Sequence, residues 1–495
     1  MKKKNLYIAL AALIALASSC KKLDVTPPAN LATTVFWKSP SDADLALTGL
    51  YNTLYASPGN LDQYGMLWFD NFSDNSYSQN NLNNSQNALI SGLTPTLGGF
   101  QSSTYQNAYV AIAASNSFLA NVGKVLSGDK LKQYRGEALF LRGFNYFLLA
   151  ELYGNVPIVT EDPFTLDYKS TRAKSPRADV LKQVESDLDS AIAYLPDSTY
   201  LKNGGHVVKA AAEGYKVRML LFEQRWAEAA ALAQTIISSN LFSLNPNYST
   251  NFYKPGQTSS PEIMFSVQYQ APAAAHPFAL TIYLIAPGWV DLQGTTDLAN
   301  EYEANDPRKN MTLFSPGDGP AQGWPFTTPA VGTPGLGNWT VGFFPTKKWI
   351  DPKLRDPTSG LKDDQDYVLL RYADIKLMYA EAKNEATGPD TSVVQQVNEV
   401  RARASTSLPH LSTTLSQDDL RQAIRHERRV ELALEGLRYF DLRRWGIAKQ
   451  KLNGFVQNPN IPGMKTVYKD AYDYWPIPQT EIDRNQGVLI QNDGY

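Results

Sequence analysis

Apolar residues recur every three or four positions through several long segments of the chain, which is the spacing that places them on one face of an α-helix. The segments with this pattern are 103–122, 129–153, 177–195, 207–223 and 226–239. Segment 129–153 is apolar on nearly all sides, so we expect a central helix that ends at Gly154 and does not resume before Pro157. The pattern predicts a mostly α-helical fold.

Two pairs of these helices have the Ala/Tyr/Phe-rich pattern of a tetratricopeptide hairpin. The first pair covers 211–237, and the second combines 371–386 with 392–404. The consensus is degenerate in both pairs, but repeated antiparallel helix pairs are typical of helical-repeat scaffolds. We therefore predict a tetratricopeptide-like helical scaffold, in which a helix from Leu369 follows an acidic first turn.

The pattern changes between residues 242 and 366. Segment 261–269 has the composition of a short strand, and long Gly- and Pro-rich stretches follow it. Loops of this length inside a compact protein are usually functional or disordered, and aromatic residues argue against disorder. The aromatic residues of interest are Tyr283, Trp289, Trp324, Trp339 and Trp349. This loop-rich region is the first candidate for a binding site.

The N-terminal part contains a second polar segment. A helix capped by Ser41 is expected to end near Pro58, and residues 73–87 follow, with too few apolar side chains to fold alone. We interpret residues 73–87 as a long surface loop. Its candidate ligand contacts are Asp74, Asn75 and Tyr77.

Segment 420–446 is expected to form one long helix followed by a bend. Leu420, Ile424, Val430, Leu434 and Leu437 place an apolar stripe along it. Seven arginines alternate with acidic residues on its other faces, among large aromatic side chains. A solvated helix could carry these charges. Guanidinium groups among aromatic rings favour instead a partly buried ionic network that joins one helix to another.

The first residues determine the expected location of the protein. Lys2, Lys3 and Lys4 precede an apolar run that is too short to span a bilayer, and small residues then lead into Cys20. Cys20 is the only cysteine, so it has no disulfide or metal cluster to belong to. The pattern predicts a lipoprotein signal peptide at 1–19, lipidation of Cys20, and a lipidated tether at 20–40.

Composition and charge exclude several function classes. The formal net charge of −2 and the absence of a basic stripe argue against nucleic-acid binding. The four histidines are scattered and lack metal-ligand spacing, so neither a metal site nor a cofactor is predicted. No nucleophile elbow or phosphate-binding glycine loop is present, whereas paired carboxylates for glycoside hydrolysis cannot be recognised without a structure. We therefore predict a binding protein and not an enzyme, in which some of the 27 tyrosines and 9 tryptophans contact the ligand.

Four segments closely resemble motifs of the SusD/RagB family of outer-membrane lipoproteins. They are EALFLRGFNYFLLAELYGNVPIV (137–159), LLRYADIKLMYAEAKNEA (369–386), LRQAIRHERRVELALEGLRYFDLRRWG (420–446) and YWPIPQTEID (474–483). They occur in the family's order, so the resemblance covers essentially the whole mature chain. It implies a SusD-like fold with an N-terminal helical region at 41–241, a loop-rich variable region at 242–366 and a C-terminal region at 367–495.

The resemblance also implies a function. Members of the family are non-catalytic, surface-exposed outer-membrane lipoproteins that capture oligosaccharides and deliver them to a SusC-like TonB-dependent transporter. Some members handle peptides instead, and a surface glycoside hydrolase is the other alternative. Because the family's binding residues lie outside its motifs, the site is predicted from the loops alone. We expect Tyr283, Trp289, Trp324 and Trp339 to stack on the ligand where the variable loops meet the polar segment that carries Asp74, Asn75 and Tyr77.

Overall fold

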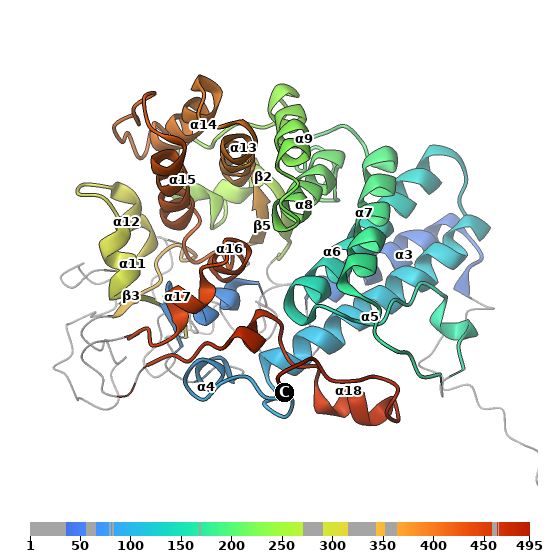
Figure 1. Ribbon diagram of the computed structural model, residues 1–495. Helices are drawn as coiled ribbons and strands as arrows, with labels where there is room; N and C mark the ends of the chain where they lie inside the picture. Colours follow the sequence, from blue (N-terminus) through green and yellow to red (C-terminus); the bar gives the residue numbers. More distant parts are fainter. Residues whose placement is uncertain are drawn as a thin grey trace, which may run out of the picture.

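The computed structural model is mostly helical, with a few short strands (Figure 1). It describes residues 36–55, 66–78, 81, 84–167, 170–270, 291–314, 343–351, 364–457, 463 and 465–495. The mostly α-helical prediction is confirmed. The predicted signal peptide, Cys20 and most of the predicted tether lie outside the described residues.

Consecutive helices of the N-terminal region pack against one another. They are α3 (Pro40–Tyr51), α4 (Ser85–Ile90), α5 (Phe100–Asn121), α6 (Gly128–Tyr153), α7 (Arg177–Tyr194), α8 (Lys209–Phe222) and α9 (Trp226–Ser238). Helix α6 contacts α5 and α7, α7 contacts α8, and α8 contacts α9. The five helices predicted from 103 to 239 are therefore confirmed, with ends that differ by a few residues.

Helix α6 is central because it is apolar on several faces and carries two glycines. A Cβ at Gly143 would lie 3.3 Å from the Cβ of Asp187, so the missing side chain allows α7 to approach closely. Arg142 of α6 then binds both carboxylate oxygens of Asp187, at 2.8 and 2.6 Å. Gly154 ends the helix with a φ of 70°, as expected from the sequence.

The C-terminal helices are α11 (Thr296–Glu301), α12 (Pro307–Thr312), α13 (Tyr372–Thr387), α14 (Thr391–Arg401), α15 (Gln417–Glu431), α16 (Arg438–Arg444), α17 (Ala448–Leu452) and α18 (Gln479–Arg484). The helices from α11 to α17 form the other side of the molecule, whereas α18 lies beside α5 (Figure 1). Helix α13 packs on α9, α14 and α15, and thereby joins the two groups of helices. The predicted pairs form as α8/α9 and α13/α14, and their assignment to the tetratricopeptide class stays a prediction.

Two small antiparallel sheets complete the fold. Strand β2 (Ile263–Val267) pairs with β5 (Tyr367–Arg371). The second sheet has the order β1 (Ser76–Tyr77), β3 (Gln293–Thr295), β4 (Phe343–Pro345). The strand predicted at 261–269 is confirmed, but the helix expected from Leu369 begins only at Tyr372, because residues 367–371 pair with β2 instead.

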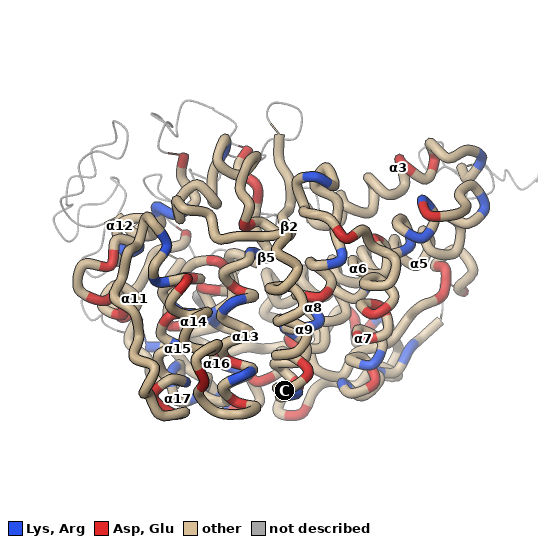
Figure 2. Tube along the Cα trace, turned by 90° about the horizontal axis from the view of Figure 1, so that it is seen from above, with Lys and Arg blue, Asp and Glu red and all other residues tan. Residues whose placement is uncertain are grey.

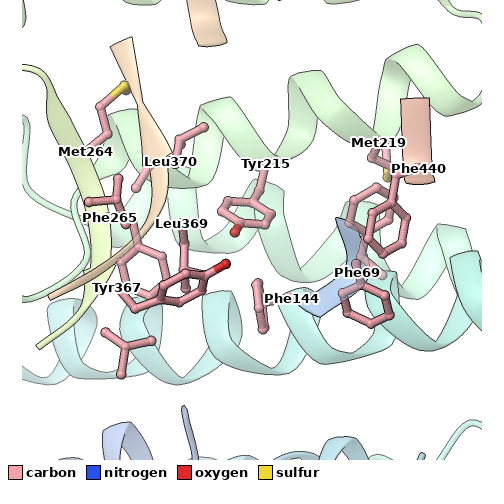
Figure 3. Packing of buried hydrophobic residues seen from close by; sticks show 14 of the residues in the cluster. Phe69, Phe144, Tyr215, Met219, Met264, Phe265, Tyr367, Leu369, Leu370 and Phe440 are labelled. Atoms are coloured by element: carbon pink, nitrogen blue, oxygen red, sulfur yellow. The ribbon is translucent and has the colours of Figure 1, made fainter. Parts of the chain in front are cut away.

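Aromatic side chains fill the core between the helices and the β2/β5 sheet (Figure 3). The rings of Phe144 in α6 and Tyr215 in α8 lie 5.3 Å apart, and Phe140 meets Phe265 of β2 at 5.0 Å, both edge-to-face. Such pairs contribute about 0.5–1.5 kcal/mol each beyond the burial of their area. Much of the aromatic content is therefore used to hold the scaffold together.

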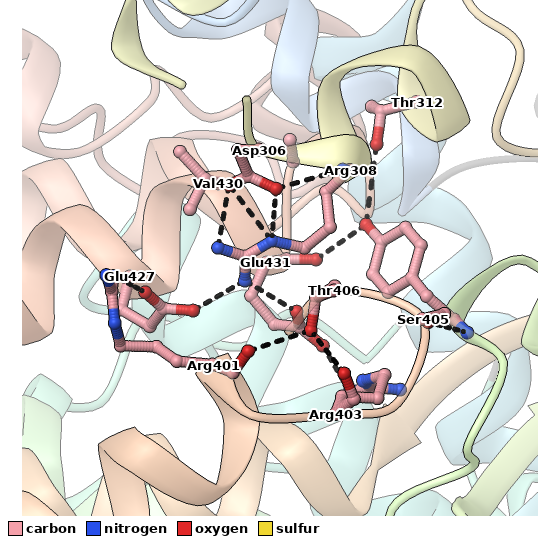
Figure 4. A network of polar contacts seen from close by, with 12 residues as sticks. Asp306, Arg308, Thr312, Arg401, Arg403, Ser405, Thr406, Glu427, Val430 and Glu431 are labelled. Carbon is pink, nitrogen blue, oxygen red and sulfur yellow. Dashed lines mark hydrogen bonds and ion pairs between the residues drawn. The ribbon is translucent and has the colours of Figure 1, made fainter. Parts of the chain in front are cut away.

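A buried ionic network fixes α15 (Figure 4). Glu431 accepts hydrogen bonds from Arg371 at 2.7 Å, Arg403 at 2.6 Å and Arg308 at 2.9 Å, which come from the end of β5, the segment after α14, and α12. All four side chains are at most 1% exposed. The predicted ionic network is confirmed, and the alternative of a solvated charged helix is wrong for this face.

Segment 420–446 is not one helix with a terminal bend. Helix α15 ends at Glu431, and α16 starts only at Arg438. Leu434 and Gly436 adopt positive φ values of 60° and 79°, which an α-helix does not allow. The prediction that Ser41 caps the first helix is also wrong, because α3 starts at Pro40 with Ser39 at the cap position.

Basic residues (Lys and Arg) and acidic residues (Asp and Glu) are mixed with one another over the described chain (Figure 2). Many of these charges belong to paired groups such as the network around Glu431. The formal net charge of −2 follows from nearly equal numbers of basic (46) and acidic (48) side chains, many of which pair locally.

Candidate functional site

The β1/β3/β4 sheet brings together the parts of the chain that the sequence selected for binding. Ser76 pairs with Gly294, and Gly294 pairs with Phe344. In the sequence, segment 271–290 ends next to β3, segment 315–342 ends next to β4, and β1 belongs to the polar N-terminal segment. The three strands that border these segments thus lie side by side. The four predicted stacking residues, Tyr283, Trp289, Trp324 and Trp339, lie outside the described residues.

Asp74 is a scaffold residue in this sheet region. Its side chain is buried, and its two carboxylate oxygens accept hydrogen bonds from Nε and Nη2 of Arg438, at 2.7 and 2.8 Å. Burial alone would raise the pKa of Asp74, but the guanidinium groups of Arg429 and Arg438 hold it well below its usual range. Asp74 therefore joins the N-terminal segment to α16, and its predicted contact with a ligand stays a prediction.

Asn75 and Tyr77 lie on the same segment. Asn75 is buried, and its side-chain oxygen accepts a hydrogen bond from Nε of Arg429 at 3.0 Å. Tyr77 is partly buried in β1, beside Gln293 of β3. Residues 73–78 are therefore not the start of a surface loop. Their polar side chains are buried and find hydrogen-bond partners in groups such as Arg429 and Asp291. The hydroxyl of Ser78, for example, donates to a carboxylate oxygen of Asp291 at 3.1 Å.

Helix α11 continues directly from β3 and is fixed on α15. The hydroxyl of Thr295 caps it by accepting the N–H of Leu298 at 3.1 Å. Arg429 donates to Glu301 at 2.9 Å, and Nδ1 of His426 lies 2.8 Å from the same carboxylate. The bond to His426 and the charge of Arg429 outweigh burial and lower the pKa of Glu301 to about 2. His426 thus has a structural role, because it helps to hold α11 on α15.

Asp70 joins the same region to the turn between α15 and α16. It belongs to the 3₁₀-helix η3 (Leu67–Phe72), and its Oδ2 accepts the backbone N–H of Gly436 at 2.9 Å. Its Oδ1 accepts the amide of Asn75 at 3.2 Å. Burial nevertheless raises the pKa of Asp70 to about 7, because neither contact supplies a full positive charge.

This pKa gives stability a defined pH dependence. Between pH 4 and 7 the folded protein holds the proton of Asp70 more tightly than the unfolded chain, so this group's contribution to the free energy of unfolding falls as pH rises through that window. We expect Asp70→Asn to remove this decrease. Urea unfolding of wild type and variant from pH 4 to 8 measures it, and a constant difference between the two proteins across the window would contradict the assignment.

Five aromatic residues of the loop-rich region were selected from the sequence, and Trp349 is the one of these five that the structure describes. It is fully buried, and its indole N–H donates to the carbonyl of Leu434 at 2.9 Å. Trp349 therefore fixes the turn after α15 and is not available for ligand stacking.

The described residues contain no group of three or more His, Cys, Asp or Glu side chains placed to hold a metal ion. In the same part of the chain, no helix has both the length and the apolar character needed to cross a bilayer.

Two family models match the chain. The model described as "SusD family" matches residues 240–495, just over half of the chain. The chain belongs to the SusD family. A second model, described as "Starch-binding associating with outer membrane", matches residues 21–221. The predicted family is confirmed.

Curated relatives match this SusD-family chain over at least 92% of its length. SusD-like protein P2 of Formosa agariphila is 24% identical over 538 residues, with 99% of this chain and 100% of the relative covered. SusD-like protein P38 of the same organism is 27% identical over 502 residues, with coverages of 92% and 95%.

Solved structures confirm the SusD-like fold. A SusD-like carbohydrate-binding protein from Bacteroides fragilis has a TM-score of 0.78 at 24% identity, covering 92% of this chain and 99% of its own. The surface glycan-binding protein A of Bacteroides thetaiotaomicron, solved with laminarihexaose, has a TM-score of 0.75 at 21% identity, covering 92% and 100%. A laminarin-binding SusD-like protein gives 0.74 at 23% identity, with coverages of 93% and 100%.

Proposed function

We propose that this protein is a non-catalytic glycan-binding lipoprotein of the outer membrane, anchored through Cys20 and facing the cell surface. It captures oligosaccharides on the loops that leave the β1/β3/β4 sheet and passes them to a SusC-like TonB-dependent transporter. The observation that carries the proposal is the pairing Ser76–Gly294–Phe344, which places side by side the strands that border the polar and aromatic-rich segments. Family membership and the glycan-binding names of structural relatives support it.

The energetics suit capture followed by release. An indole that covers about 100 Å² of the apolar face of a sugar ring gives roughly 2.5 kcal/mol before ordering costs. Two or three such contacts give dissociation constants from about millimolar to micromolar. Delivery further requires that the ligand contact the transporter-bound, closed state better than the open one. Recovery of the native lipoprotein alone and monomeric from gently solubilised membranes would contradict this step.

The binding step can be tested with the mature chain carrying Cys20→Ser, which prevents lipidation. Isothermal titration against laminarin-derived and other oligosaccharides should show binding to one glycan class, without product formation. Combined alanine substitution of Trp289, Trp324 and Trp339 should lower that affinity by about 100-fold, because it removes at least 3 kcal/mol of stacking.

Phe164→Ala is the matched control, since it removes an aromatic side chain that is 68% exposed on a different surface, near α5. It should leave the affinity unchanged. Unchanged affinity in a folded triple variant would contradict the placement of the site. Heat from a peptide digest but not from glycans would indicate the peptide-binding alternative, and released sugars would indicate a hydrolase.

A further inference from the structure

A cavity of about 180 Å³ with both apolar and polar walls lies apart from the β1/β3/β4 sheet. It opens to solvent and is bordered by the end of α3 and the 3₁₀-turn η1 (Asn52–Leu54), by the turn before α8, and by the end of β2. Its lining consists of Thr48, Tyr51, Leu54, Tyr55, Gly205, His206, Ser266, Val267 and Gln268. The cavity is far larger than one water needs and has several polar groups, so it can hold a polar molecule.

His206 is held in one orientation at this cavity. Its Nδ1 lies 2.8 Å from Oε2 of Glu137, a fully buried carboxylate of α6. The hydroxyl of Tyr51 donates to the same oxygen at 2.7 Å and accepts the N–H of Val207 at 2.9 Å. With Nδ1 engaged, the opposite ring nitrogen, Nε2, is the one left for a ligand, and the side chain is 45% exposed. The hydrogen bond to the Glu137 carboxylate also raises the pKa of His206 above its ordinary value.

The tyrosine and glutamine residues of the other walls are also held in place by contacts within the protein. The ring of Tyr55 meets Tyr269 edge-to-face at 4.8 Å, and its hydroxyl donates to the carbonyl of Gln268. Gly205 has a φ of +81°, and a Cβ there would lie 1.9 Å from Nε2 of Gln268. The glycine therefore gives the Gln268 amide room to lie across the turn. A ligand would meet two fixed tyrosine rings, one imidazole and one amide.

We propose that this cavity is a subsite for one neutral sugar unit, and this inference rests on the proposed glycan-binding function. The tyrosine rings supply apolar surface for the C–H face of a pyranose, and His206 and Gln268 supply hydrogen-bonding groups for its hydroxyls. No lysine or arginine lines the cavity. Because the negative charge of Glu137 compensates a protonated His206, the site has no net positive charge with which to select a carboxylate-bearing sugar.

Two single variants in the mature Cys20→Ser chain test the subsite. His206→Gln and Gln268→Ala should each lower the affinity for the bound oligosaccharide by about 3- to 10-fold, the effect of one lost hydrogen bond. His410→Gln is the matched control because His410 is exposed and does not line the cavity, and it should leave the affinity unchanged. Thermal melting of each variant verifies that it is folded.

A second readout follows the cavity directly. With ¹⁵N-labelled histidine, the ring signals of His206 should shift when the corresponding neutral monosaccharide is added, whereas those of His410 should not. Wild-type glycan binding with unchanged affinity in both variants and an unmoved His206 signal would overturn the subsite and leave the proposed function intact. No binding of any glycan by the wild type would overturn both.

Discussion

Glu431→Ala should destabilise the protein by about 3–5 kcal/mol, a large part of the 5–15 kcal/mol that is typical of a folded protein. The carboxylate of Glu431 is fully buried and accepts hydrogen bonds from Arg308, Arg371 and Arg403. Burial favours its neutral form, yet the three guanidinium groups hold its pKa well below the usual range. Its removal leaves an excess positive charge in a site that water does not reach.

Urea unfolding at pH 7 measures this effect, and Glu228→Ala is the control. Glu228 pairs with Arg225, but its side chain is 58% exposed, so the same substitution should cost no more than about 1 kcal/mol. Equal losses in the two variants would show that the buried network contributes no more than a surface ion pair.

The sequence predicted the parts of the fold that depend on local periodicity. Helices such as α6 and α7 bury their apolar faces within a continuous segment, so their spacing alone reveals them. The break between α15 and α16 was missed because the apolar repeat continues through Leu434, while the tertiary contacts of residues 432–437 impose the turn. Gly436 was the available signal, since a glycine within a helical pattern lowers the case for a continuous helix, and here it takes a positive φ in the turn.

The candidate site was less accessible from sequence. Pairing between β1 and β3 joins residues more than 200 positions apart, in strands of two and three residues that carry no alternating pattern. Asp74 is a typical ligand-binding residue type, and its burial depends on Arg438, which lies 364 residues away. Residues such as His206 and Gln268 give no sequence signal at all, because only the folded chain places them around one cavity.

Gly436→Ala should also be strongly destabilising, by about 3 kcal/mol or more. The residue has a φ of +79°, and a Cβ there would lie 1.7 Å from the carbonyl oxygen of Met66. A backbone atom cannot rotate away, so the turn and the start of η3 must separate, which adds an overpacking cost of about 1–3 kcal/mol to the cost of positive φ. The same movement weakens the bond from the Gly436 N–H to Asp70.

Gly446→Ala is the control that separates the cost of overpacking from the cost of a positive φ. Gly446 has a similar φ of +68°, but nothing lies within 4 Å of the added Cβ, so only the conformational cost of about 1–2 kcal/mol applies. Because Asp70 precedes Asp74 and β1 on one continuous buried segment, Gly436→Ala should also lower glycan affinity, whereas Gly446→Ala should not. Equal unfolding free energies for the two variants would contradict the close contact at Met66. A folded Gly436→Ala protein with unchanged affinity would instead separate the turn from the binding loops.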